Sequence, residues 1–194
     1  FIDRVINGQG RAIGSHFAPT EPGYVHMANM YPYNPRRATA LLKEAGISTP
    51  LTLTLSLPPA PYALLGGPVL QEHLKQVGIQ LNLQILDWQQ WLNGPFKGQF
   101  DLTLINHVAA LDYTIYGDPD YYFGYDSPAF RQLLLRHGTT LSPREKQILL
   151  AGIQRKLAED AVNAWIYTPD TTSILRKGIQ GWRISYPVFS HDLS

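Results

Sequence analysis

Residues 51–85 read LTLTLSLPPAPYALLGGPVLQEHLKQVGIQLNLQI. The opening LTLTLSL alternates leucine with small polar residues, which predicts a half-buried strand. The closing IQLNLQI alternates in the same way and predicts a second strand. Between them, apolar residues recur at helical spacing, so a helix is expected over about residues 62–77, with Gly78 as its stop. A strand, a helix and a strand in this order form a βαβ unit, and its two strands should be parallel.

Other helices are marked by a capping residue that is followed directly by proline. The pairs are Asn34-Pro35, Ser127-Pro128 and Ser142-Pro143. The capping side chain accepts a hydrogen bond from a free amide of the first turn, and proline suits the first helical position. The last of these helices should run to about Ala161, with an apolar stripe that faces the core. The expected stripe is Ile148, Leu149, Ile153, Leu157 and Ala161.

The stretch from Phe100 to Tyr122, FDLTLINHVAALDYTIYGDPDYY, changes character part-way. Its first residues are apolar and predict a third, mostly buried strand. A polar, tyrosine-rich loop follows and carries Asp112, Asp118 and Asp120. Open α/β sheets bind ligands where loops leave the carboxyl ends of strands. The sequence therefore predicts that this loop contacts a ligand.

The two ends of the chain show weaker patterns. Residues 1–30 are expected to be mainly loop, with a short helix end and a turn near the start. Short strands are expected around residues 164–167, 172–175 and 182–185. The sequence opens at Phe1 without an initiator methionine, so we expect a domain of a longer protein.

The composition excludes several classes of function. The 16 Lys+Arg and 15 Asp+Glu residues leave a net charge of +1, which gives no electrostatic case for nucleic acid or an anionic membrane. The chain has no cysteine, which removes disulfides, thiolate metal sites and thiol nucleophiles. The 6 histidines form no short metal-ligand pair, and neither a G-x-S-x-G nor an H-E-x-x-H motif occurs. We therefore expect no metal, no cofactor and no catalysis.

The order of motifs resembles one family. YPYNPRRATALLKEAG at residues 31–46 is similar to the Tyr-x-x-(Asp/Asn)-Pro-x-x-Ala-x-x-Leu-Leu-x-x-Ala-Gly signature of extracytoplasmic solute-binding proteins of the peptide/nickel class of ABC importers, bacterial family 5. The strand–helix–strand motif, FDLTLIN, GDPDYYFGYDSPAFRQLL and REKQILLAGIQRKLAEDAVNAWIY follow in family order. The resemblance covers roughly residues 24–185, and its strength lies in the ordered combination of motifs.

The resemblance implies an α/β lobe with a mixed, mostly parallel sheet flanked by helices, one of two lobes that close on a ligand. Residues 31–185 would form the C-terminal lobe, residues 1–30 a connecting segment, and residues 186–194 a return toward the other lobe. The expected function is binding of a solute, most simply a peptide, and its delivery to a membrane ABC permease from the periplasm or another extracytoplasmic space. The alternatives are the sensing domain of a transcriptional regulator, or a binding protein for a nickel chelate or a sugar.

Peptide-binding members of the family pair an aspartate of the loop after the FDL strand with the ligand's α-ammonium group. Asp112 is the candidate for this role, and Asp118 is a rival that caps the turn before Pro119 in the structural interpretation. His107, Tyr113 and Tyr116 are the expected neighbours in the ligand site. The loop departs from the usual family pattern because it lacks a tryptophan.

Overall fold

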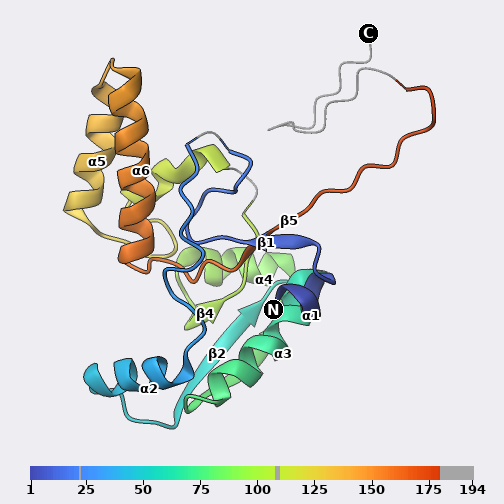
Figure 1. Ribbon diagram of the computed structural model, residues 1–194. Coiled ribbons are helices and arrows are strands. Elements are labelled where there is room, and N and C mark those ends of the chain that lie inside the picture. Colours follow the sequence, from blue (N-terminus) through green and yellow to red (C-terminus); the bar gives the residue numbers. More distant parts are fainter. Residues whose placement is uncertain (22, 108–109, 180–194) are drawn as a thin grey trace.

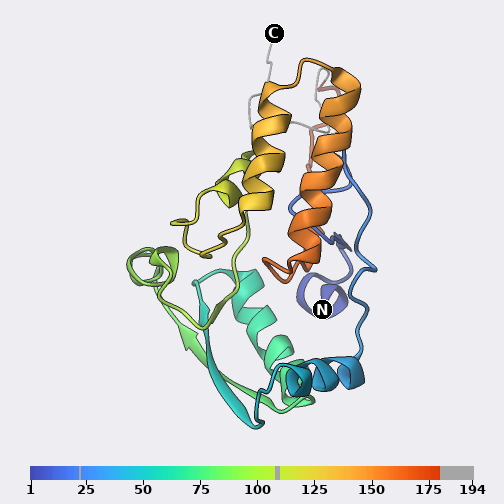
Figure 2. The ribbon, with the colours of Figure 1, turned by 90° about the vertical axis from the view of Figure 1, so that its left-hand side faces the viewer.

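The computed structural model describes residues 1–21, 23–107 and 110–179. A small sheet with its helices lies at one end of the molecule and a helical hairpin at the other (Figure 1, Figure 2). No helix in these ranges has the length and apolar character needed to cross a membrane. In chain order the elements are α1 (Ile2–Ile6), β1 (Gly10–Ala12), α2 (Pro35–Glu44), β2 (Leu51–Leu57), α3 (Pro61–Lys75), β3 (Ile79–Ile85), α4 (Trp88–Asn93), the 3-10 helix η1 (Pro95–Lys97), β4 (Leu102–Thr103), the 3-10 helix η2 (Ala110–Gly117), α5 (Pro128–Thr139), α6 (Pro143–Glu159) and β5 (Tyr167–Pro169).

β2 is the centre of a three-stranded parallel sheet with the order β3-β2-β4. β2 and β3 pair along their full length, and α3 is the crossover between them, so the predicted βαβ unit is confirmed. Gly78 ends this crossover with a φ of 82°, a conformation that glycine adopts without steric cost. The core of this half of the molecule consists of Leu55, Leu57, Ala63 and Leu81.

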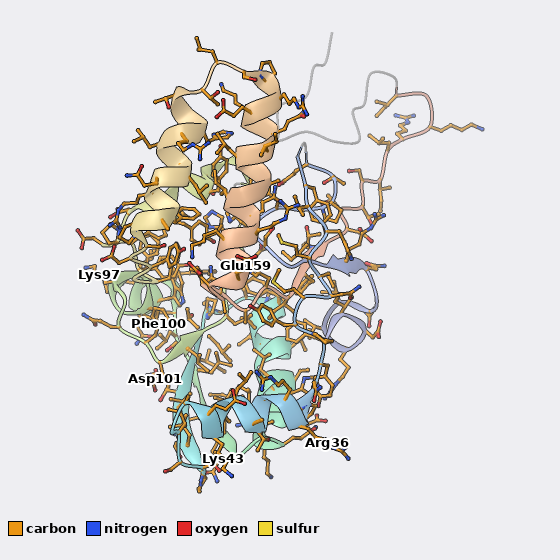
Figure 3. The ribbon with its side chains drawn as sticks, turned by 60° about the vertical axis from the view of Figure 1, so that its left-hand side comes forward. Arg36, Lys43, Lys97, Phe100, Asp101 and Glu159 are labelled. Carbon is orange, nitrogen blue, oxygen red and sulfur yellow. The ribbon has the colours of Figure 1, made fainter. Side chains whose placement is uncertain are left out.

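β4 is shorter than the predicted third strand, and side chains extend its contacts with β2. The carboxylate Oδ2 of Asp101 (Figure 3) accepts a hydrogen bond from the amide of Thr54 at 2.8 Å. The hydroxyl of Thr103 donates to the carbonyl oxygen of Ser56 at 2.9 Å. The chain is therefore held against β2 up to the start of the predicted ligand loop.

The helical hairpin of α5 and α6 forms the other half (Figure 2). Its core cluster contains Tyr116, Phe130, Ile153 and Leu157. The predicted stripe was wrong at its two ends. Ile148 is 62% exposed, because it precedes the buried Leu149 by one position, which is a rotation of about 100° around the helix axis. Ala161 lies beyond the end of α6 with a φ of 48°, and Ala158 is buried in its place.

The described strands form two separate sheets, a three-stranded parallel one and a two-stranded antiparallel one, rather than the single mixed sheet that was expected. β1 pairs antiparallel with β5, with Gly10 opposite Pro169. β5 is the strand predicted near residues 164–167, displaced toward the C-terminus. The strand predicted at residues 172–175 does not form, and Ile174 there is 96% exposed. The strand predicted at 182–185 and the return segment 186–194 lie outside the described residues.

The segment between β1 and α2 runs beside α6, as the blue trace in Figure 2 shows. We call residues 13–21 and 23–30 the crossing segment. Gln154 of α6 is completely buried and binds this segment at two points. Its Nε2 donates to the carbonyl oxygen of Gly23 at 2.6 Å, and its Oε1 accepts from the amide of Val25 at 2.9 Å. This clamp places the residues of the crossing segment next to η2.

Candidate functional site

Asp112 lies at a break in η2, in the loop that follows the carboxyl end of β4. Its backbone has φ −90° and ψ 20°, which is not helical, so the helical turns on its two sides do not continue through it. This region of φ/ψ space is sparsely populated and often occupied by residues of functional sites. The side chain is 33% exposed, so a ligand has access to the carboxylate.

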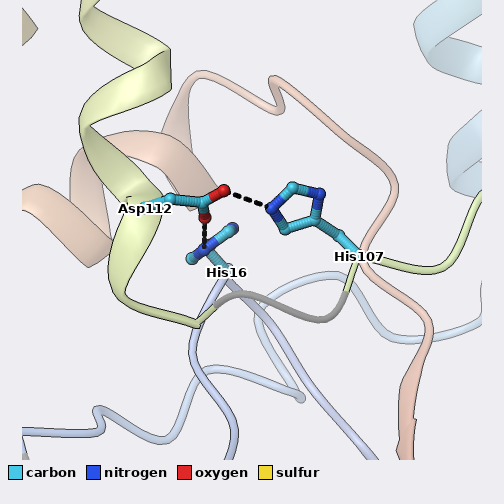
Figure 4. Close-up of side chains that lie close together, drawn as sticks. All are labelled: His16, His107 and Asp112. Atoms are coloured by element: carbon cyan, nitrogen blue, oxygen red, sulfur yellow. Dashed lines mark hydrogen bonds and ion pairs between the residues drawn. The ribbon is translucent and has the colours of Figure 1, made fainter. Parts of the chain in front are cut away.

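Two imidazoles contact this carboxylate from different parts of the chain (Figure 4). The Nε2 atom of His107 lies 2.7 Å from Oδ2 of Asp112, and the His107 side chain is 37% exposed. The Nε2 atom of His16 lies 3.2 Å from Oδ1, and the His16 side chain is only 3% exposed. The potential ligand atoms of the three residues all lie within 4.8 Å of one another. We call His16, His107 and Asp112 the carboxylate–imidazole cluster.

The structure thus brings together two of the predicted residues and one that sequence reasoning missed. His107 and Asp112 were predicted as neighbours because they share one loop. His16 comes from the crossing segment, and no local spacing links it to that loop. Only the docking of the crossing segment on α6 brings it to the site.

Tyr116 orients His16 from the buried side. Its hydroxyl lies 3.3 Å from Nδ1 of His16 and accepts a hydrogen bond from Nδ2 of Asn163 at 3.2 Å. The Tyr116 side chain is 4% exposed and belongs to the core of the helical half. Burial raises the pKa of this phenol well above its usual range, so the hydroxyl keeps its proton. Tyr116 is therefore shielded from solvent and contacts the cluster by way of His16.

The other two predicted residues, Tyr113 and Asp118, are not members of the cluster. The hydroxyl of Tyr113 is 3.5 Å from Nδ1 of His137, and its ring packs on Phe17 with centroids 5.4 Å apart. Asp118 is exposed, and its Oδ1 accepts a hydrogen bond from the amide of Asp120 at 3.0 Å. This is the turn-capping geometry that the sequence offered as the structural interpretation of Asp118.

The end of the tyrosine-rich loop packs into a band of rings. Tyr122 lies between Phe96 and Phe123, with ring centroids 5.3 Å and 5.1 Å away. Burial raises the pKa of Tyr122 to about 12. Burial and the nearby Asp160 carboxylate, to which its hydroxyl donates, likewise raise the pKa of Tyr125 to about 12.

These raised pKa values predict a loss of stability at high pH. The unfolded chain loses the phenolic protons near pH 10, whereas the folded chain holds them until about pH 12, so the stabilisation is complete below pH 10 and disappears between these values. Urea unfolding at pH 8, 10, 11 and 12 measures it. Tyr122→Phe should flatten this decline, and Tyr31→Phe, at an exposed phenol, should not. A stability that stays constant to pH 12 would contradict the prediction.

Comparison with known proteins identifies the family. The family model described as bacterial extracellular solute-binding proteins, family 5, middle part, matches residues 1–129. The chain belongs to this family. This family consists of solute-binding proteins, so the resemblance that the order of motifs indicated is confirmed.

The relatives are longer than this chain. Di/tripeptide-binding protein 4 of Pseudomonas aeruginosa is 37% identical over 109 residues, which are 54% of this chain and 19% of that protein. The dipeptide-binding protein of Escherichia coli is 28% identical over 63% of this chain and 23% of its own length. The matched part of this chain therefore spans between about a fifth and two fifths of the length of the curated relatives.

A solved structure shows the same fold. The dipeptide-binding protein of Pseudoalteromonas sp. SM9913, in complex with Met-Leu, superposes with a TM-score of 0.78 at 19% identity. The match covers 87% of this chain and 36% of that one. The chain thus has an α/β fold with a parallel sheet and flanking helices, and this fold matches part of that structure.

Proposed function

We propose that this chain forms one wall of the ligand cleft in a two-lobed protein that binds peptides and delivers them to an ABC importer outside the cytoplasm. The names of the relatives support peptides as the solute class, since they are di/tripeptide-binding and dipeptide-binding proteins. The second wall would come from parts of the protein beyond this chain. The permease that receives the solute is the expected membrane partner.

The observation that carries this proposal is the partly exposed side chain of Asp112, in the loop that follows β4 of the parallel sheet. A carboxylate in this position pairs well with an α-ammonium group, because charge-assisted hydrogen bonds are about twice as strong as neutral ones. His107 is exposed on the same side, as a neighbour for the peptide main chain. Tyr113, which packs on Phe17, and Tyr116, which contacts His16, would line the site on the side away from solvent. Asp118 remains a second candidate carboxylate.

The test is calorimetric titration of the complete protein with dipeptides and tripeptides in the presence of EDTA. Asp112→Asn keeps the shape of the side chain and removes its charge, so it should weaken binding at least about tenfold. N-acetylated peptides, which lack the ammonium group, should bind the wild type as weakly as free peptides bind the variant. Asp118→Asn is the matched control and should change affinity less than about twofold. Equal affinity of wild type and Asp112→Asn would reject Asp112 as the ammonium partner.

A further inference from the structure

The carboxylate–imidazole cluster has the composition of a transition-metal site. Two imidazole nitrogens and one carboxylate oxygen are ligands that zinc, nickel, cobalt and copper ions accept, whereas magnesium and calcium prefer oxygen alone. The sequence argued against a metal because no two histidines lie close together along the chain. The fold supplies the missing pair by placing the buried His16 opposite His107.

The three ligand atoms lie within 4.8 Å of one another, so an ion can bind them after they adjust to the spacing that it requires. Ligand atoms around a tetrahedral ion with bonds of about 2.0–2.1 Å lie roughly 3.3 Å apart. Nε2 of His16 and Oδ1 of Asp112 are already 3.2 Å apart. The 2.7 Å contact of His107 with Oδ2 must widen by about 0.6 Å to reach that spacing, and the partly exposed ring of His107 has solvent beside it for that movement.

The bonding of the carboxylate also favours an ion. Oδ1 of Asp112 is buried and accepts no hydrogen bond within the described part of the chain, although Nε2 of His16 lies at ion-pair distance. A buried carboxylate oxygen without a hydrogen bond is costly, and coordination of a cation removes that cost. Nothing comparable is seen at Asp118, whose Oδ1 is satisfied by a backbone amide.

His16 has the second contact that a metal-binding histidine usually makes. When one ring nitrogen binds an ion, the other commonly donates a hydrogen bond that fixes the tautomer and the orientation of the ring. Nδ1 of His16 faces the hydroxyl oxygen of Tyr116 at 3.3 Å. That oxygen also accepts from Asn163, and its two lone pairs are sufficient for both donors. Tyr116 is thus a positioning residue that leaves Nε2 directed at the cluster.

We propose that His16, His107 and Asp112 bind one divalent ion of the late first-row transition series, with zinc and nickel as the probes. The ion would be reached from the exposed side, between His107 and Asp112, so its remaining coordination positions face solvent. Amino and carboxylate groups of a solute are suitable ligands for those positions. The inference uses the same cluster as the proposed function, but it does not depend on peptide binding.

The experiment titrates the complete, tag-free protein with ZnCl₂ and NiCl₂ by calorimetry, without peptide. One ion per chain should bind, and MgCl₂ should give no saturable signal. His107→Gln and Asp112→Asn should each weaken binding at least about tenfold, and Tyr116→Phe about tenfold through the lost orientation of His16. His73→Gln, at a histidine outside the cluster, should change affinity less than about twofold.

Thermal unfolding shows whether these three residues bind zinc or only contact one another to stabilise the fold. Zinc should raise the melting temperature of the wild type and of His73→Gln, and it should raise that of Asp112→Asn much less. His107→Gln and Asp112→Asn are both expected to fold, because His107 and Asp112 are partly exposed. Absence of saturable zinc and nickel binding by the wild type would overturn the proposal, as would unchanged binding in His107→Gln and Asp112→Asn. Peptide binding in EDTA is measured separately, so failure of either proposal leaves the other standing.

Discussion

Phe130→Ala should lower the free energy of unfolding by about 3–5 kcal/mol, the usual cost of removing a fully buried phenylalanine. Phe130 is 0% exposed and lies in the first turn of α5. Its ring packs edge-on against Tyr116 and Tyr125, with centroids 6.4 Å and 5.5 Å away. Alanine leaves a cavity between α5, α6 and η2 that the rings around it cannot close without moving, because their own packing fixes them.

Urea unfolding at neutral pH, followed by circular dichroism, measures this loss. Ile148→Ala is the control, because Ile148 is an apolar residue of the same hairpin with 62% exposure, and its replacement should cost no more than about 0.5 kcal/mol. A loss below about 1 kcal/mol in Phe130→Ala would show that the cluster does not hold the hairpin together.

Gly14→Ala should destabilise the fold by about 3 kcal/mol or more, although it adds a single methyl group. Gly14 lies in the crossing segment, where a Cβ atom would collide with the backbone of Met27 and Ala28. Backbone atoms cannot rotate away as a side chain does, so the two passes of the crossing segment must separate. His16 follows two residues later, and we expect the substitution to weaken zinc binding together with stability.

Thermal unfolding of Gly14→Ala is best compared with that of Gly138→Ala. Gly138 lies inside α5, and a Cβ atom there meets nothing within 4 Å. Alanine at that position should stabilise the protein by about 0.5–1 kcal/mol, because it favours the helix and restricts the unfolded chain. Equal melting temperatures of Gly14→Ala and wild type would mean that the crossing segment does not pack as closely as described.

The βαβ unit was predictable because its information is local. The alternation in LTLTLSL and IQLNLQI indicates one buried face for each strand. A helix between two strands allows few arrangements other than a parallel pair joined by a crossover. Ile148 and Ala161 show the limit of this reasoning. A helix pattern gives the spacing of buried positions, but the partner surface decides where the stripe begins and ends, and here that surface is α5 and η2.

The candidate site was predictable only in part, for the same reason. Asp112 and His107 stand out because they follow a buried strand in one polar loop. His16 does not, since neither its neighbours nor its spacing indicates a site, and its position depends on Gln154, which resembles an ordinary polar helix residue in the sequence. The pairing of β1 with β5 was missed likewise, because two three-residue strands more than 150 positions apart carry almost no pattern.

The clamp at Gln154 also bears on the order in which the molecule assembles. The pairing of β2 with β3 joins residues 28 positions apart, such as Leu51 and Ile79, whereas the hydrogen bond from Val25 to Gln154 joins residues 129 positions apart. Loop-closure entropy grows with the logarithm of length, so this long closure becomes favourable mainly after the segments it joins have formed. We therefore expect the carboxylate–imidazole cluster to form late in folding. A nascent chain would acquire its secondary structure first and its capacity to bind a ligand last.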